Sequence, residues 1–347
     1  MTKNIKYRVL GVMSGTSLDG IDLSICSFIK TKNWQFNIEK CATFPYNKYW
    51  KETLKNLHLK SIVEINLINK EYGVLIGETI NAFLDNEKVD FISSHGHTIF
   101  HQPQNKYTLQ VGDGKTIAKV TNTTTINDFR SLDISLNGQG APLVPIGDLH
   151  LFQDYKYCVN LGGFANISIK EKNKIIAFDI CPANIVLNNI CSRLNIEYDN
   201  KGSIAREVKL IPKLLQQLNE LQFYKITTPK SLGREWVEEY ISPLIVNEKN
   251  EDALRTFCEH IAIQIGSLLK HKSAFFTGGG VFNNFLMERI QHHSSSKIII
   301  PSHDIINFKE ALLFGFLAVL RIRNEINCLQ SVTGAERDNC GGVIHKS

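Results

Sequence analysis

The sequence predicts an α/β protein built from two similar halves. Strand and helix patterns alternate along its 347 residues, as expected for sheets covered by helices. A glycine-punctuated turn between two apolar stretches opens each half, at 11–22 and at 157–169. The chain is long enough for two domains with separate cores. We therefore expect a first domain at 1–150, a second at 151–323, and a tail at 324–347 that is either disordered or packed back on the first domain.

The first half is predicted to begin with three strands and a long helix. That helix starts with a capping box at Ser61 and Glu64, and its apolar residues recur on one face as far as Phe83. We expect strands at 7–12, 21–28, 34–43, 89–93, 108–111 and 124–127, and a second helix at 114–120.

The second half repeats this pattern, which indicates a weak internal duplication. Its third strand ends in the carboxylate of Asp179, and Pro182 is expected to open a helix, because proline suits the first helical position. Further strands are expected at 273–277 and 297–300, and helices at 204–223 with a break near Pro212, 234–240, 252–270, after Gly280, and at 310–323.

Composition excludes several classes of protein. The net charge of +5 is spread along the chain, so nucleic-acid binding is not expected. The N-terminus has no apolar signal core and no apolar run approaches the ~20 residues of a membrane helix, so we expect neither secretion nor a membrane anchor. The eight cysteines form no C-x-x-C pair, which indicates reduced thiols in the cytoplasm.

Three glycine turns suggest a nucleotide site. Glycines let backbone N–H groups converge on phosphate, and a glycine run between strand and helix can approach adenine or ribose closely. An ordinary polar hairpin is the alternative for the first turn. The chain has neither a P-loop nor the protein-kinase motifs. The order of the turns favours the actin-like ATPase and sugar-kinase superfamily, with a ribonuclease H-like fold and with ATP and substrate in the cleft between domains. The predicted cofactor-binding residues are Gly15, Thr16, Ser17, Leu18, Asp19, Gly20, Ile21, Asp22, Gly162, Gly163, Gly278, Gly279 and Gly280.

Several motifs together resemble those of the anhydro-N-acetylmuramic acid kinases. They are GVMSGTSLDGID (11–22), SHGHTIFH (94–101), QVGDG (110–114), NDFR (127–130), GQGAPLVP (138–145) and NLGGFANIS (160–168). The resemblance spans about residues 8–320. It implies a cytoplasmic enzyme of cell-wall recycling that uses ATP and water to open the 1,6-anhydro ring of anhydro-N-acetylmuramate, giving N-acetylmuramate 6-phosphate and ADP.

The resemblance also implies that Asp179 is the general base. A carboxylate at a strand end can deprotonate the water that attacks the anomeric carbon, while O6 takes the phosphoryl group instead of a proton. One carboxylate then does what glycosidases do with two. The alternative is a helix cap, but Pro182 at the first helical position would put the cap at Cys181, so Asp179 lies too early.

The remaining candidate residues each keep an alternative role. Asp19 is predicted to help hold Mg²⁺, or else to form an Asx turn. Arg130 suits the lactyl carboxylate of the sugar, or else pairs with Asp128.

The other substrate candidates are Ser14, Asp128, His97 and Glu310. His97 could instead be structural, or could bind a metal with His95 and His101, and Glu310 could only complement a helix dipole.

The chain departs from the family pattern at two places. Ile180-Cys181 replaces Thr-Gly after Asp179, which puts a substrate contact there in doubt and suggests sensitivity to thiol reagents. Ile146-Gly147-Asp148 replaces Ala-Phe-His, so no role of that histidine can be transferred.

Other functions remain open at this point. They are a kinase of the same fold for another sugar or a carboxylate, an ATP-gated binding protein, and a metal-dependent hydrolase. The expected partner is a small anhydrosugar, with no nucleic acid and no membrane, and a homodimer is expected.

Overall fold

The structure, a computed structural model, describes residues 5–15, 18–172, 174–226 and 230–347. The chain divides into two compact units, Met1–Leu151 with Phe308–Ser347, and Phe152–Asn307. The C-terminal helix, expected in the second domain, packs with the first unit. The domain division expected from the sequence otherwise stays a prediction.

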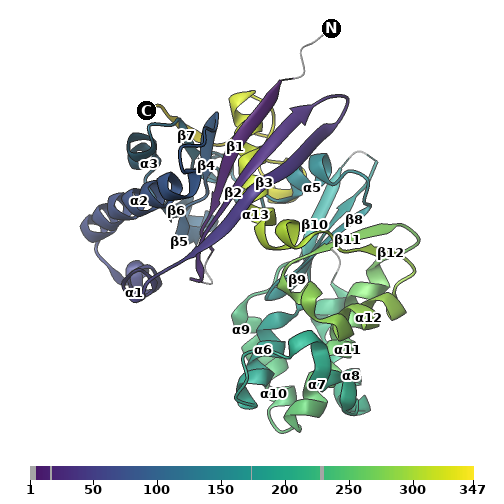
Figure 1. Ribbon diagram of the computed structural model, residues 1–347. Coiled ribbons are helices and arrows are strands. Elements are labelled where there is room, and N and C mark those ends of the chain that lie inside the picture. Colours follow the sequence, from purple (N-terminus) through teal and green to yellow (C-terminus); the bar gives the residue numbers. More distant parts are fainter. Residues whose placement is uncertain (1–4, 16–17, 173, 227–229) are drawn as a thin grey trace. The chain divides into compact units, whose positions relative to one another are not determined.

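The first unit is built on a six-stranded sheet of order β13-β7-β4-β1-β2-β3 (Figure 1). Its strands are β1 (Lys6–Met13), β2 (Gly20–Lys30), β3 (Trp34–Pro45), β4 (Phe91–Ser94), β7 (Thr125–Asn127) and β13 (Val343–His345). Strands β1, β2 and β3 are antiparallel neighbours, whereas β4 and β7 run parallel to β1. The C-terminal strand β13 pairs with β7, so the tail packs back on this unit.

Helices and one hairpin complete the first unit. They are α1 (Lys48–Asn56), α2 (Ile62–Leu84), α3 (Gly114–Thr121), α4 (Ser131–Ser135), α5 (Pro145–Leu151), α13 (His303–Ile322, part of this unit from Phe308 on), α14 (Gln330–Thr333), and the hairpin β5 (His97–Gln102) with β6 (Tyr107–Val111). The predicted capping box of α2 is present at Ser61 and Glu64. Helix α13 lies directly on β1, because a Cβ on Gly11 would be 1.9 Å from the Ala311 carbonyl oxygen.

The second unit is built on a five-stranded sheet of order β10-β9-β8-β11-β12. Its strands are β8 (Tyr157–Leu161), β9 (Phe164–Lys170), β10 (Ile175–Pro182), β11 (Ser273–Thr277) and β12 (Lys297–Ile299). Its helices are α6 (Asn184–Arg193), α7 (Ser203–Glu207), α8 (Pro212–Asn219), α9 (Arg234–Trp236), α10 (Ser242–Ile245), α11 (Asn250–Leu268) and α12 (Asn284–His293).

Both units share one strand order. In chain order it is third-second-first-fourth-fifth, with three antiparallel strands followed by two parallel ones. This is the order of the ribonuclease H-like fold, and its occurrence twice in one chain is that of the actin-like ATPases. The predicted fold class and internal duplication are therefore confirmed, and β13 is an addition at the edge of the first sheet.

Two boundaries differ from the prediction. Pro182 does not open a helix: it ends β10, and α6 begins two residues later after Ala183. Strand β10 is an edge strand, where proline removes no ladder hydrogen bond. Helix α13 begins at His303 and has a kink at Phe308, so Glu310 lies inside a helix and not at its start.

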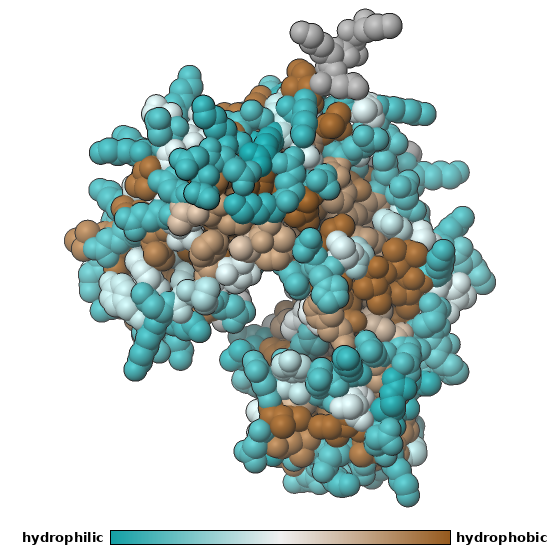
Figure 2. All heavy atoms as spheres, in the orientation of Figure 1, coloured by the Kyte–Doolittle hydropathy of each residue, from teal (hydrophilic) through white to brown (hydrophobic). Residues whose placement is uncertain are grey.

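Figure 2 shows hydrophilic side chains over most of the visible face, with apolar side chains in smaller groups. Within the described part of the chain, every helix is too short or too polar to cross a bilayer.

Candidate active site

The first glycine turn joins β1 to β2. The Leu18 N–H donates to the Gly15 carbonyl (3.3 Å), and Leu18 has a left-handed φ of 60°. Asp19 is exposed beside this turn. Thr16 and Ser17, two predicted phosphate contacts, lie outside the described residues. The described part of the turn is therefore a tight backbone loop with an accessible carboxylate.

The last three residues of this motif have structural roles in β2. A Cβ on Gly20 would lie 2.3 Å from the Phe44 carbonyl oxygen, so packing alone requires glycine there. The Ile21 side chain belongs to the core, with 2% of its surface exposed. Asp22 accepts a hydrogen bond from Thr43 Oγ1 (2.6 Å), and burial raises the pKa of this carboxyl. Nucleotide contacts by these residues stay a prediction.

The other two glycine turns lie side by side in the second unit, because Thr277 of β11 pairs with Asn160 of β8. Gly278 has a left-handed φ of 86°, and a Cβ there would lie 2.6 Å from Asn160 Oδ1. A Cβ on Gly280 would lie 2.8 Å from Leu161 Cβ. These two glycines are required by the fold.

Three other glycines of these turns have no such requirement. A Cβ on Gly279 would meet nothing within 4 Å, and one on Gly163 only Ile185 at 3.8 Å. One on Gly162 would lie 3.3 Å from Asn160 Nδ2 and 3.5 Å from the Phe164 carbonyl oxygen, both in its own turn. None of the three has a positive φ. Neither backbone conformation nor packing against Gly163 and Gly279 explains why these positions carry no side chain.

Asp179 lies at a β-bulge in β10, where the register shifts between Asp179 and Cys181. Its Oδ2 accepts a hydrogen bond from the Leu232 N–H (2.9 Å), and its own N–H donates to the Lys230 carbonyl (3.1 Å). Burial raises the pKa of this carboxyl, and the Leu232 bond opposes that rise. Bulges often redirect side chains next to active sites. Asp179 does not cap α6, since the cap position is Ala183.

The side chains of the two residues after Asp179 are buried in the protein interior. Ile180 is part of the hydrophobic core of the second unit. Cys181 is fully buried, and burial raises the pKa of its thiol. Because the reactive form of cysteine is the exposed thiolate, sensitivity of Cys181 to thiol reagents is not expected.

Arg130 is held on two sides in the first unit. Its Nη1 donates to the Gly140 carbonyl (2.7 Å), and its Nη2 and Nε approach His95 Nε2 at 2.9 and 3.3 Å. His95 Nδ1 lies 2.7 Å from the Gly96 carbonyl oxygen, so Nδ1 carries the proton and Nε2 accepts. Burial and the charge of Arg130 lower the pKa of His95 to about 3, which keeps the ring neutral.

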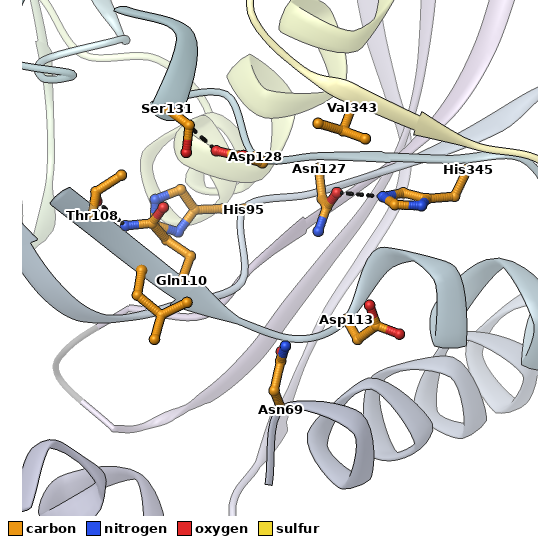
Figure 3. A pocket seen from close by; sticks show the side chains of 11 residues that line it. Asn69, His95, Thr108, Gln110, Asp113, Asn127, Asp128, Ser131, Val343 and His345 are labelled. Carbon is orange, nitrogen blue, oxygen red and sulfur yellow. Dashed lines mark hydrogen bonds between the residues drawn. The ribbon is translucent and has the colours of Figure 1, made fainter. Parts of the chain in front are cut away.

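The predicted ion pair between Asp128 and Arg130 is not formed in the described part of the chain. Asp128 Oδ1 instead accepts a hydrogen bond from the Ser131 N–H at 3.1 Å (Figure 3). A cavity of about 220 Å³ lies beside Asp128 and His95. Asn127 of β7 and His345 of the C-terminal tail also line it. The carboxylate of Asp128 is thus separate from the guanidinium.

Two buried polar atoms near the end of β4 have no hydrogen-bond partner among the described residues. They are Ser94 Oγ and His97 Nδ1. Burial lowers the pKa of His97, and the Gly15 backbone acts in the opposite direction. Ser14 is buried directly after β1 beside the hydroxyls of Tyr46 and Tyr72, and its Oγ also has no hydrogen-bond partner among the described residues. An unsatisfied buried polar atom costs about 1–3 kcal/mol, so a ligand or a water is expected at this point.

Ser94 was not a candidate from the sequence, although it opens the SHGHTIFH motif. Its place in that motif was the available signal. His95, also missed as a site residue, was grouped with His97 and His101 only by spacing. The described residues contain no group of three metal-ligating side chains, and His95 is committed to Arg130.

Glu310 reaches solvent on α13, yet the protein around it displaces enough water to raise the pKa of its carboxyl. Lys309 and Arg130 oppose that rise, whereas Asp22 adds to it. The neighbouring Lys309 Nζ lies 2.9 Å from Asp148 Oδ1, and both side chains are buried. Asp148, at the position of the family's histidine, therefore anchors α13 beside Glu310.

Solved structures with a similar fold share little sequence with this chain. The activator of the 2-hydroxyisocaproyl-CoA dehydratase from Clostridium difficile, with bound ADPNP, has a TM-score of 0.43 and 15% identity over 91% of this chain and 97% of that one. A ROK family glucokinase from Streptomyces griseus, in complex with glucose and AMPPNP, has a TM-score of 0.42 and 10% identity over 89% and 98%. The fold assignment above depends on the strand order alone.

Comparison of the amino-acid sequence with protein families identifies the family of this chain. The family profile described as anhydro-N-acetylmuramic acid kinase matches residues 7–347. The protein of that name from Sulfurovum sp. (strain NBC37-1) is 33% identical over 98% of this chain and 99% of its own length. The one from Hydrogenovibrio crunogenus (strain DSM 25203 / XCL-2) is 32% identical over 96% and 97%. The chain therefore belongs to the anhydro-N-acetylmuramic acid kinase family, a family of phosphotransferases.

Proposed function

We propose that this enzyme opens the 1,6-anhydro ring of anhydro-N-acetylmuramate with water and phosphorylates O6 with ATP. The products are N-acetylmuramate 6-phosphate and ADP, and the reaction serves cell-wall recycling in the cytoplasm. The names of the relatives support the substrate. The structural observation that carries the proposal is Asp179, a half-buried carboxylate at a bulge, fixed by one backbone N–H.

Asp179 acts as the general base. Its Oδ2 is held by Leu232, and no second side-chain hydrogen bond to Asp179 is found among the described residues, so Oδ1 is free to accept a proton from water. The water oxygen bonds to C1 as the C1–O6 bond breaks, and O6 takes the γ-phosphoryl group as the bond to ADP breaks. The proton of the water passes to Asp179. A raised pKa suits this role, because a stronger base accepts the proton more readily.

Gly163 and Gly279, the open glycines at which a Cβ would find room, are the proposed nucleotide contacts of the second unit. Since the fold does not require glycine at Gly163 and Gly279, the close approach of a ligand to the backbone is a sufficient reason for it. Gly278 and Gly280 then keep the two turns in register and contact ATP only through the backbone.

Asp19 fits the role of a magnesium ligand. Its carboxylate is exposed at the first turn, and Mg²⁺ prefers oxygen donors while keeping several waters. Bound magnesium would neutralise charge on the phosphates of ATP.

Arg130 is the proposed contact for the lactyl carboxylate. Arginine has five N–H donors, and the bonds to His95 and Gly140 use three of them, which leaves one on each Nη without a partner among the described residues. Two such donors match a carboxylate. Ser94, His97 and Glu310 are proposed to bind the hydroxyl and amide groups of the sugar, which would satisfy the two unpartnered buried atoms.

The test measures ADP release with anhydro-N-acetylmuramate as acceptor. Asp179→Asn should lower kcat about 10²–10⁴-fold with ATP affinity unchanged, because the base is lost and the nucleotide contacts remain. Asp154→Asn, an exposed carboxylate of the same unit, is the matched control and should keep full activity. Wild-type turnover with another sugar or a carboxylate, but not with the anhydrosugar, would favour the second candidate, a kinase of the same fold with a different acceptor.

A further inference from the structure

We infer that Asp133 is a positioning residue for Arg130, acting through Gly140, and that the C-terminal segment 327–341 completes this support. The inference rests on the proposed function, since it gives Arg130 its substrate role. It assigns a function in the active site to a tail whose Thr333 lies 200 positions away in sequence from Asp133.

Asp133 is a fully buried carboxylate that accepts four hydrogen bonds from residues the structure describes. Its Oδ2 accepts from the Gly140 N–H at 2.8 Å. Its Oδ1 accepts from three side chains of the tail, Cys328 Sγ (3.1 Å), Thr333 Oγ1 (2.8 Å) and Asn339 Nδ2 (2.8 Å). A buried carboxylate is stable only when its oxygens are satisfied in this way. The two oxygens thus divide between the loop and the tail.

The loop 138–140 lies directly on this carboxylate. A Cβ on Gly138 would be 2.1 Å from Asp133 Oδ2, and the Gly138 N–H donates to the Asp133 carbonyl (2.9 Å). The Gln139 N–H donates to the Thr333 carbonyl (2.9 Å), so the tail also holds the loop through backbone. The next carbonyl, that of Gly140, is the one that accepts from Arg130 Nη1.

The tail segment is itself held as one piece. Cys328 and Asn339 form a pair of backbone hydrogen bonds at 3.0 and 3.1 Å. Asn327 bonds Gly341 through both its side-chain atoms, at 2.8 Å each. The donors that reach Asp133 are therefore fixed relative to one another, and a change in any of them is transmitted to Gly140.

A purely structural carboxylate and a positioning one predict different kinetics. If Asp133 only stabilises the unit, its loss lowers the melting temperature and leaves the substrate KM of the folded enzyme unchanged. If it places the Gly140 carbonyl, its loss lets the guanidinium move, and a displacement of about 1 Å weakens a two-point contact with a carboxylate.

The test is a double-mutant cycle on Asp133→Asn and Arg130→Lys, with KM for the anhydrosugar and for ATP measured by ADP release. Asp133→Asn should raise the sugar KM about tenfold and leave the ATP KM within about twofold. Arg130→Lys should raise the sugar KM at least as much, and the double variant should match Arg130→Lys alone, because Asp133 acts through the arginine. Multiplicative effects in the double variant, or an unchanged sugar KM in Asp133→Asn, would overturn the inference.

A milder variant covers the case in which Asp133→Asn does not fold. Thr333→Val removes one donor to Asp133 and should raise the sugar KM about threefold to tenfold. Its matched control is Thr121→Val, since Thr121 is another buried threonine of the same unit, and among the described residues its hydroxyl bonds only the Ile117 carbonyl (2.8 Å). Equal KM values in the two valine variants would contradict the inference. A wild-type enzyme that does not use the anhydrosugar would instead contradict the proposed function.

Discussion

At the scale of single residues, the two histidines of the short motif Ser94-His95-Gly96-His97 differ in their hydrogen bonding. His95 is buried and bonds Arg130, whereas His97, two residues later, keeps an unpartnered buried nitrogen among the described residues. Gly96 between them has a left-handed φ of 75°, which turns the chain from β4 into β5. Spacing grouped His95, His97 and His101 as possible metal ligands, and only His97 was expected to contact the sugar. It could not reveal that the lone pair of His95 would face an arginine 35 positions later, because that contact depends on the tertiary fold.

The neutral ring of His95 is predicted to orient Arg130 for the substrate. His95→Leu removes the acceptor and should raise the sugar KM about tenfold or more, whereas His95→Gln keeps an acceptor and should recover part of the loss. The measurement is steady-state kinetics at fixed, saturating ATP. Identical KM values for the leucine and glutamine variants would mean that the hydrogen bond has no role in binding.

At the scale of elements, the sequence was informative wherever pattern and capping agreed. The three opening strands, helix α2 with its capping box and the strands of the second unit lie close to their predicted ranges. Several elements were missed, among them α1, α4, α5, α14, β5 and β13. Strand β5 is polar at four of its six residues, α1 begins three residues after the end of β3, and α5 is short and begins at Pro145. The prediction that Pro182 opens a helix was wrong because Pro182 ends an edge strand. Which strand lies at the edge depends on the order of the strands in the sheet, which the local sequence does not give.

The glycine turns provide a prediction at this scale. Gly163→Ala and Gly279→Ala should leave the melting temperature within a few degrees of the wild type, since a Cβ finds room at both positions, yet should weaken ATP binding about tenfold or more. Gly280→Ala is the matched control within the same turn: it should destabilise the protein, because its Cβ would meet Leu161. Calorimetric titration with a non-hydrolysable ATP analogue and thermal unfolding give the two readouts. Unchanged affinity in both open-glycine variants would contradict the assignment of these turns to the nucleotide.

At the scale of the whole molecule, the two units share a strand order and one electrostatic feature. Each buries a histidine whose pKa burial lowers to about 3, His95 in the first and His260 in the second. His260 lies between Asn219 Oδ1 (2.7 Å) and the Tyr224 hydroxyl (2.8 Å). Sequence could not separate these two from the other histidines, since burial is a property of the assembled core.

Both histidines are predicted to make the fold acid-sensitive. Below about pH 6.5 the unfolded chain binds a proton at each site that the folded chain does not, so stability falls as the pH falls from about 6.5 towards 3. Each site contributes a slope of about 1.4 kcal/mol per pH unit in that window and none above it. His260→Gln should flatten the dependence by one such slope in urea unfolding at several pH values. His303→Gln, which changes an exposed histidine, should leave it as in the wild type. Equal slopes in all three proteins would exclude this origin of acid sensitivity.

In the proposed mechanism, ring opening by water and phosphoryl transfer occur in one reaction, with Asp179 as base. It is tested most directly by running the reaction in ¹⁸O-water with ATP and anhydro-N-acetylmuramate, and analysing the product by mass spectrometry. We expect one ¹⁸O at the anomeric hydroxyl, an unlabelled phosphate on O6, and loss of this product in Asp179→Asn. A phosphorylated product that keeps the anhydro ring, or that carries no label, would contradict it.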